Sequence, residues 1–185
     1  MKLVVLGDSL TTGLGLPVSQ AFPARLASAL KAKGIAAEIA DAGVSGDTAT
    51  AGLARIDWSV PDDAGGVIVA LGGNDMLRGV DPKVTRAAID GILRRLAERR
   101  IPALLAGMRA APNLGADYVA RFEAIFPELA KSHDVLFHPF FLEGVAADPK
   151  LNQRDGIHPS APGVEKIVAG ILPKVEELIS RISKP

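Results

Sequence analysis

The sequence predicts an α/β protein in which helices cover both faces of a parallel sheet. Short apolar runs alternate with longer helical stretches along the 185 residues, and such alternation is typical of a parallel sheet. The clearest run, Val67-Ile68-Val69-Ala70-Leu71, is apolar throughout, as in a strand that is buried on both faces. Polar motifs follow several of these runs, and the carboxyl ends of parallel strands form the edge where α/β proteins bind ligands.

Before that central strand, the chain predicts two strands and two helices. Residues 3–6 are the first strand. Residues 22–33 form a helix that ends at Gly34, because glycine is favoured just past a helix C-terminus. Residues 37–42 are the second strand, and residues 48–58 are the second helix.

After the central strand, the alternation continues to the C-terminus. Asp81 caps the next helix and Pro82 occupies its first turn. The further elements are a helix over 81–100, a strand over 103–106, a helix over 116–132, a strand over 135–137 and a helix over 160–182. Pro173 lies within the last helix and is expected to kink it. Because the chain has no repeat or linker, residues 1–185 are predicted to form a single domain.

The composition excludes several classes of function. The chain has 21 basic and 21 acidic residues and only 4% aromatic residues, so we expect no nucleic-acid partner. The lack of cysteine excludes disulfides, thiolate metal sites and a cysteine nucleophile. No two histidines have the spacing of metal ligands, and no phosphate-binding or dinucleotide-binding fingerprint is complete. We therefore expect neither a metal ion nor a cofactor.

The sequence leaves the cellular compartment open. No apolar run approaches the length of about 20 residues that spans a bilayer, so no integral membrane segment is expected. No signal peptide precedes the first strand. A periplasmic or secreted location is expected if one has been removed, and a cytoplasmic location otherwise. The oligomeric state is also left open.

A serine after the first strand is the candidate nucleophile. Ser9 lies in a Gly-Asp-Ser-Leu stretch, and a serine hydroxyl needs a base to take its proton. Among the three histidines, His158 follows Asp155 by three residues in a loop, a spacing that lets the carboxylate hold the imidazole. His133 is expected to be a capping or solvated residue, and His138 a packing residue. Ser9, Asp155 and His158 therefore predict a catalytic triad.

Three groups at strand ends are candidate donors for the oxyanion that forms in acyl transfer. They are the backbone N–H groups of Ser9 and Gly46 and the side-chain amide of Asn74. Taken alone, the stretch around Gly46 is typical of a helix-capping turn, and the stretch around Asn74 is typical of a turn that ends a strand. Their joint occurrence at strand ends favours the catalytic interpretation.

These motifs resemble those of the SGNH hydrolases, also called GDSL esterases or lipases. Four blocks occur in order: Gly7-Asp8-Ser9-Leu10, Gly46, Gly72-Gly73-Asn74-Asp75 and Asp155-Gly156-Ile157-His158-Pro159. The chain looks similar to the bacterial branch of multifunctional thioesterase-lysophospholipases and small arylesterases. The resemblance implies a three-layer α/β/α, flavodoxin-like fold with a mainly five-stranded parallel sheet. It also implies Ser9 as nucleophile, His158 as base, Asp155 as its orienting partner, and an oxyanion hole from Ser9, Gly46 and Asn74.

The resemblance further implies that residues 107–115, after the fourth strand, shape the acyl pocket. Taken alone, this segment is also consistent with a simple turn into the next helix. Its small residues Gly107, Ala110 and Ala111 favour an open, apolar pocket, and Arg109 faces either an anionic head group or solvent. The expected substrate-binding residues are Asp8, Asp75, Met108, Arg109, Ala110, Ala111, Pro112 and Leu114.

The sequence therefore predicts a serine ester hydrolase that forms an acyl-enzyme on Ser9 and acts on a small-molecule acyl ester. Short- to medium-chain aryl or alkyl esters are the expected substrates, with acyl thioesters and lysophospholipids as further candidates. Two alternatives stay open. One is a carbohydrate O-acetylesterase with the same mechanism, and the other is a non-catalytic, flavodoxin-like module that binds a small anion.

Overall fold

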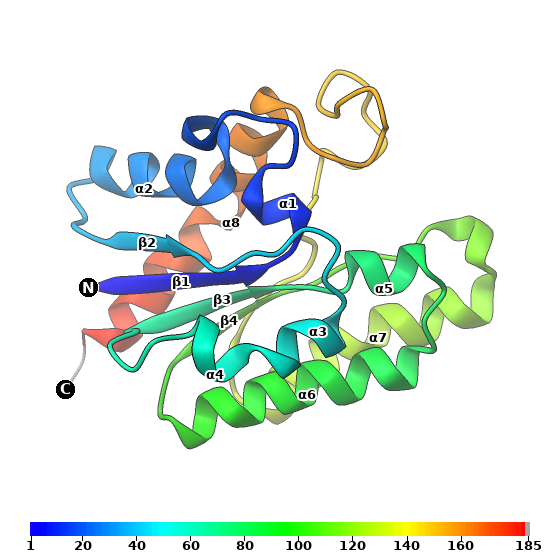
Figure 1. The fold of residues 1–185 in the computed structure, drawn as a ribbon, viewed down its shortest axis with the longest axis horizontal. Helices are drawn as coiled ribbons and strands as arrows, with labels where there is room; N and C mark the ends of the chain where they lie inside the picture. The colour runs from blue at the N-terminus through cyan, green and yellow to red at the C-terminus, as the bar shows by residue number, and fades with distance from the viewer. Residues whose placement is uncertain (184–185) are drawn as a thin grey trace.

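The structure, a computed structural model, describes residues 1–183, and a five-stranded sheet forms its centre (Figure 1). The strand order is β2-β1-β3-β4-β5, and every pair of neighbouring strands is parallel. The strands are β1 Lys2–Gly7, β2 Glu38–Asp41, β3 Gly66–Ala70, β4 Ala103–Ala106 and β5 Leu136–His138. The α/β class and the parallel sheet that the sequence predicts are confirmed.

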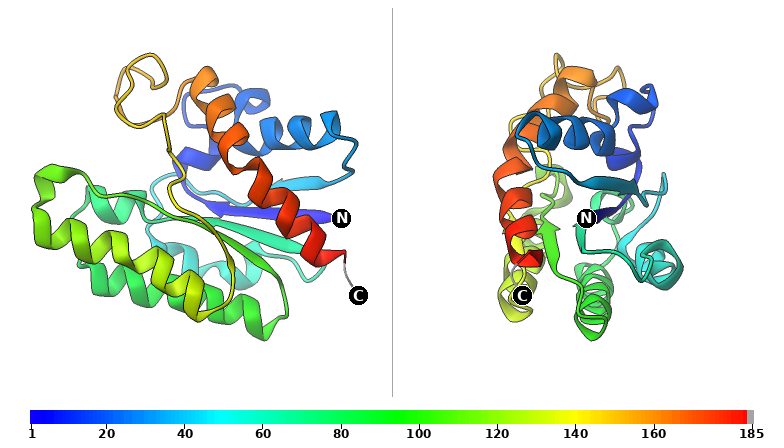
Figure 2. Two further views of the ribbon diagram at one scale, coloured as in Figure 1. Left: turned by 180° about the vertical axis from the view of Figure 1, so that it is seen from behind. Right: turned by 90° about the vertical axis from the view of Figure 1, so that its left-hand side faces the viewer.

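Helices cover both faces of the sheet, so the fold has three layers (Figures 1 and 2). On one face, α2 Phe22–Ala32 packs against α8 Ala161–Ile182. On the other face, α6 Pro82–Glu98 packs against both α3 Ala49–Ala54 and α7 Ala116–Ser132. The shorter helices are α1 Ser9–Thr12, α4 Ile56–Ser59 and α5 Gly73–Leu77, with 3₁₀ turns at Val18–Gln20 and Pro112–Leu114.

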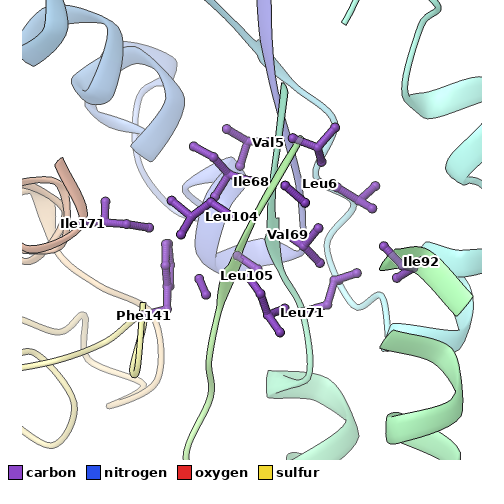
Figure 3. Close-up of a cluster of buried hydrophobic side chains, with 14 of the residues drawn as sticks. Val5, Leu6, Ile68, Val69, Leu71, Ile92, Leu104, Leu105, Phe141 and Ile171 are labelled. Atoms are coloured by element: carbon purple, nitrogen blue, oxygen red, sulfur yellow. The ribbon is translucent and has the colours of Figure 1, made fainter. Parts of the chain in front are cut away.

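The strands are apolar because helices cover the sheet on both sides. Successive residues of a strand point to opposite faces. Figure 3 shows Ile68 and Leu104 on the side of Ile171 in α8, whereas Val69 lies on the side of Ile92 in α6. All five side chains are fully buried. Burying each of them contributes about 1.5–3 kcal/mol, so both faces of the sheet hold the layers together.

The predicted elements agree with the structure to within two residues at their ends, with one exception. The predicted helix over 48–58 is divided into α3 and α4 at Arg55, whose φ is −111°. The Arg55 side chain is buried there rather than exposed on a helix surface. Pro173 lies inside α8, which remains one helix over its full length.

No helix within residues 1–183 is both long enough and apolar enough to cross a bilayer.

Replacing Phe22 with alanine is expected to lower the free energy of unfolding by about 3–5 kcal/mol. Phe22 is fully buried in α2, and its ring meets that of Phe141 edge-to-face with centroids 5.1 Å apart, so the change leaves a cavity between two segments. Urea unfolding measures the loss. Trp58→Ala is the control, because Trp58 is 75% exposed and its removal should cost less than about 0.5 kcal/mol. Equal losses in the two variants would contradict the packing described.

Candidate active site

The carboxyl ends of β1 and β3 are neighbours in the sheet, and they bring Ser9 and Asn74 to the same edge. Ser9 starts α1 directly after β1, and Asn74 lies in α5 directly after β3. Because parallel strands end at the same edge, side chains far apart in the chain meet there. The Asn74 amide Nδ2 lies 3.3 Å from Oδ2 of Asp8, a residue 66 positions away.

The turn after β1 holds Ser9 in a tight, buried position. Asp8 caps α1, since its Oδ1 accepts a hydrogen bond of 2.9 Å from the Leu10 N–H. Gly7 is needed before it, because a Cβ at this position would lie 2.3 Å from the Thr11 hydroxyl oxygen. Ser9 is only 8% exposed, so the turn presents its hydroxyl to the pocket and little else.

Ser9, His158 and Asp155 form a continuous chain of hydrogen bonds. The Ser9 Oγ lies 2.9 Å from the His158 Nε2, and the His158 Nδ1 lies 2.6 Å from the Asp155 Oδ2. The other Asp155 oxygen accepts from the N–H groups of His158 and Ile157. These backbone bonds, together with the bond from the imidazole, lower the pKa of Asp155 from 3.8 to about 2. At neutral pH the carboxylate is therefore ionised and orients the imidazole.

The long loop between β5 and α8 is fastened to the segment that follows α1. The Gln153 side-chain amide donates to the Leu14 carbonyl at 2.7 Å and to the Pro159 carbonyl at 3.0 Å. The Gln153 N–H donates to the His158 carbonyl at 2.7 Å. These bonds fix the backbone of the loop on both sides of the imidazole, so the position of His158 relative to Ser9 does not depend on the triad alone.

The three expected oxyanion donors line the same pocket as the Ser9 hydroxyl. Among residues 1–183, neither the Ser9 nor the Gly46 N–H donates a hydrogen bond to another protein atom. The Asn74 Nδ2 donates to the Asp47 carbonyl at 2.9 Å and, over the longer distance of 3.3 Å, to Asp8. Two backbone N–H groups are therefore free to meet a negative charge, and the Asn74 amide has one hydrogen bond of ordinary length and one longer bond.

Asp8 is a buried carboxyl group beside these donors. It has no exposed surface, and burial raises its pKa from 3.8 to about 6, against the opposing effect of the hydrogen bonds from Leu10 and Asn74. Desolvation penalises the charged form of a carboxyl group. The Asp8 carboxylate is therefore held in the structure at a cost in stability.

The pocket beside Ser9 has a volume of about 540 Å³. Six of the expected substrate-binding residues line it, namely Asp8, Met108, Arg109, Ala110, Ala111 and Pro112. The Arg109 guanidinium lies 5.0 Å from the centre of the Phe140 ring and 3.7 Å from the Glu143 carboxylate. An apolar cavity with few polar groups suits a small organic ligand.

Two expected substrate-binding residues, Asp75 and Leu114, are not among the residues that line the pocket. Asp75 is fully buried, and its two oxygens accept hydrogen bonds from the Ala49 N–H at 2.8 Å and from the Thr85 hydroxyl at 3.0 Å. It therefore joins α5 to α3 and α6. Leu114 packs against the hydrophobic core.

The loop after β5 supplies pocket residues that the sequence analysis missed. Phe140, Leu142 and Ala146 line the cavity, as do Leu77 and Ile157 at its rim. The position of residues 140–146 after the fifth strand is the signal that was available, because that strand ends at the same edge as β1.

The other two histidines lie outside the pocket. His133 ends α7, and its Nε2 lies 2.7 Å from the Asp90 carboxylate. His138 is half-buried, and burial lowers its pKa. Within residues 1–183, no three histidine, cysteine, aspartate or glutamate side chains gather closely enough to hold a metal ion.

Comparison with known proteins identifies related chains over nearly the whole length. A family model described as "GDSL-like Lipase/Acylhydrolase family" matches residues 5–166. The esterase TesA of Pseudomonas aeruginosa is 32% identical over 178 residues, which cover 96% of this chain and 89% of that protein. An arylesterase of Vibrio mimicus is 36% identical over 180 residues, which cover 94% of this chain and 88% of that protein.

Solved structures give the same result for the fold. The crystal structure of AlinE4, described as an SGNH-hydrolase family esterase, is 48% identical, with a TM-score of 0.81 over 95% of both chains. The crystal structure of TesA aligns with a TM-score of 0.91 over 96% of this chain and 99% of that chain. The flavodoxin-like architecture expected from the resemblance is therefore confirmed.

In the wild type, the free energy of unfolding should decline as pH rises from about 4 to about 6. Asp8→Asn is expected to remove this decline. Because the pKa of Asp8 is raised to about 6 in the folded protein, the folded state binds more protons than the unfolded chain in this window, and stability falls as pH rises through it. One pKa unit corresponds to about 1.4 kcal/mol, so the full decline is on the order of 3 kcal/mol. Urea unfolding of both proteins across the window measures the difference.

Asparagine caps a helix as well as aspartate does, so Asp8→Asn keeps the bond from Leu10. Asp81→Asn is the matched control, because the Asp81 side chain caps α6 by accepting from the Lys83 N–H but is 56% exposed. The same pH dependence in wild type and Asp8→Asn would refute the assignment of the raised pKa to Asp8.

Proposed function

We propose that this chain, which belongs to the GDSL-like lipase/acylhydrolase family and is a carboxylic ester hydrolase, forms an acyl-enzyme on Ser9. The observation that carries the proposal is the unbroken chain of hydrogen bonds from the Ser9 hydroxyl through His158 to Asp155. It supplies a nucleophile, a base and a group that orients the base. The single sheet and the continuous core support the further proposal that residues 1–185 act as one domain.

Acylation starts when the Ser9 Oγ attacks the carbonyl carbon of the ester. The His158 Nε2, 2.9 Å away, takes the hydroxyl proton as the new C–O bond forms. The positive charge on the imidazolium is stabilised by the Asp155 carboxylate, whose low pKa keeps it ionised. The tetrahedral intermediate then collapses, and the Nε2 proton passes to the leaving alkoxide.

The negative charge on the carbonyl oxygen is received by the N–H groups of Ser9 and Gly46 and by the Asn74 amide. The longer of the two Asn74 hydrogen bonds, that to Asp8 at 3.3 Å, is the one that the oxyanion displaces. The shorter bond, to the Asp47 carbonyl, keeps the amide in place. Donors held in advance of the reaction need no reorganisation when charge develops.

Deacylation repeats the same steps with water as the nucleophile. His158 takes a proton from the water, which attacks the acyl carbon, and the oxyanion is stabilised by the same donors. The carboxylic acid leaves when Ser9 regains its proton from the imidazolium. Both half-reactions use the same triad and the same oxyanion donors.

Short- to medium-chain aryl or alkyl esters are the proposed substrates. The pocket volume of about 540 Å³ and its apolar residues from the loops after β4 and β5 support an acyl chain of several carbons. The related arylesterase supports aryl leaving groups. Acyl thioesters and lysophospholipids are included in the proposal because the same mechanism cleaves them, with a thiolate or an alkoxide as leaving group.

Ser9→Ala is expected to abolish the hydrolysis of p-nitrophenyl esters from acetate to palmitate, because it removes the nucleophile. For the wild type, each added methylene should strengthen binding by about 0.8 kcal/mol. The value of kcat/KM should therefore rise with chain length until the acyl chain fills the pocket. Absorbance of released p-nitrophenol measures both results. Ser28→Ala, which changes an exposed hydroxyl on α2, is the matched control.

Activity that survives in Ser9→Ala would overturn the nucleophile assignment. If the wild type cleaves acetylated sugars but none of these esters, the O-acetylesterase alternative is correct. If the wild type cleaves neither and a fluorophosphonate does not label Ser9, the binding-module alternative is correct.

Asn74→Ala is expected to lower kcat by about 10²–10³, as the loss of one oxyanion donor does in other hydrolases. KM should change little, because the donor acts mainly on the charge of the transition state. Steady-state kinetics on the best p-nitrophenyl ester measures both constants. Asn113→Ala, in an exposed turn, controls for the loss of an asparagine. Full activity of Asn74→Ala would remove Asn74 from the mechanism.

A further inference from the structure

Arg55 is a buried cation behind the active site, and we infer that it is a positioning residue for the oxyanion hole. It does not line the pocket, so it acts through its hydrogen bonds to other residues rather than on substrate. The inference rests on the proposed function, because it assigns a role within that reaction.

The Arg55 guanidinium joins the end of β1 to the segment that follows β2. Its Nε donates to the Asp47 carboxylate at 2.6 Å. Its Nη1 donates to the Ala42 carbonyl at 2.6 Å and to the Ser59 hydroxyl at 2.9 Å. Its Nη2 donates to the Gly7 carbonyl at 3.0 Å. The side chain is only 7% exposed, so these bonds are shielded from water and from salt.

Each oxyanion donor lies close to one of these contacts. The Gly7 carbonyl belongs to the last residue of β1, two positions before Ser9. Asp47 directly follows Gly46, and its carbonyl accepts the 2.9 Å hydrogen bond from the Asn74 amide. The Gly7 carbonyl also accepts a hydrogen bond of 3.1 Å from the Val44 N–H, and the guanidinium adds a side-chain connection between the end of β1 and the loop after β2. The relative positions of the three donors depend on these connections.

Arginine suits this position because of the geometry of its donors. Its planar guanidinium presents five N–H groups in a rigid fork, whereas lysine has a single ammonium group on a flexible stem. One ammonium group cannot reach acceptors on Gly7, Ala42 and Asp47 in the same directions. Lysine would keep the charge beside Asp47 but would release at least one of the two strand ends.

The test is Arg55→Lys, with p-nitrophenyl butyrate as substrate. Active sites are counted with a fluorophosphonate, so that kcat refers to folded, reactive enzyme only. We expect kcat per active site to fall about 10- to 100-fold, the cost of a misplacement of up to about 1 Å, while KM changes less than about 3-fold. The inhibition constant of an alkyl boronic acid, whose tetrahedral adduct mimics the intermediate, should rise by a similar factor.

Arg99→Lys is the matched control. The Arg99 side chain is 13% exposed and donates to the Val60 carbonyl and the Asp62 carboxylate. Arg99 precedes β4, so it lies near the amino ends of the strands, away from the pocket. The Arg99→Lys variant should leave kcat per active site unchanged.

Asp47→Asn is a second test variant, since it keeps the backbone contacts of Arg55 and removes only the ion pair. It should lower kcat by a smaller factor with KM again unchanged, and it decides the question if Arg55→Lys does not fold.

Wild-type values of kcat per active site in Arg55→Lys and Asp47→Asn would overturn the inference, even if both variants melt at lower temperature. Equal losses in Arg55→Lys and Arg99→Lys would also overturn it, because they would show a general effect on stability. A wild type that neither cleaves esters nor reacts with the fluorophosphonate would overturn the proposed function instead, and the inference with it.

Discussion

The active site depends on one constraint of the sheet: β1 lies between β2 and β3, and all three strands run in the same direction. Their carboxyl ends are therefore adjacent, and the segments that follow them supply Ser9, Gly46 and Asn74. No local interaction along the chain could bring these residues together. The loop after β5 then adds Asp155 and His158, and His158 meets Ser9 across 149 residues of sequence.

Buried polar groups keep these strand ends in register. Arg55 bridges the ends of β1 and β2, and Asp75 bridges α5 to α3 and α6 through hydrogen bonds to the Ala49 N–H and Thr85. Burying such groups is costly unless every polar atom finds a partner. Satisfied networks of this kind hold side chains in one arrangement. The active site gains donors that are already in place before a charge develops, and the raised pKa of Asp8 shows that this arrangement is not free of cost.

The proposed nucleophile and much of the apolar pocket wall come from different parts of the sheet edge. The nucleophile and the oxyanion donors follow β1, β2 and β3, whereas much of the apolar pocket wall follows β4 and β5, through Met108, Ala110, Phe140 and Leu142. Changes in the second group alter the shape of the cavity without moving Ser9. These wall residues carry none of the proposed reacting atoms, although the loop after β5 also holds His158.

The sequence by itself predicted the elements and the side chains of the proposed triad, because both leave short-range signals. Strand runs, the Asp81 cap and the Asp155–His158 spacing can all be recognised within a few residues. Tertiary structure decided what depends on packing between elements. Asp75 binds α3 and α6, Leu114 packs against the core, Phe140 lines the pocket, and Arg55 divides a predicted helix and contacts two strand ends. Whether a side chain faces core or cavity is fixed by neighbours that lie far away in the chain, so no local pattern records it.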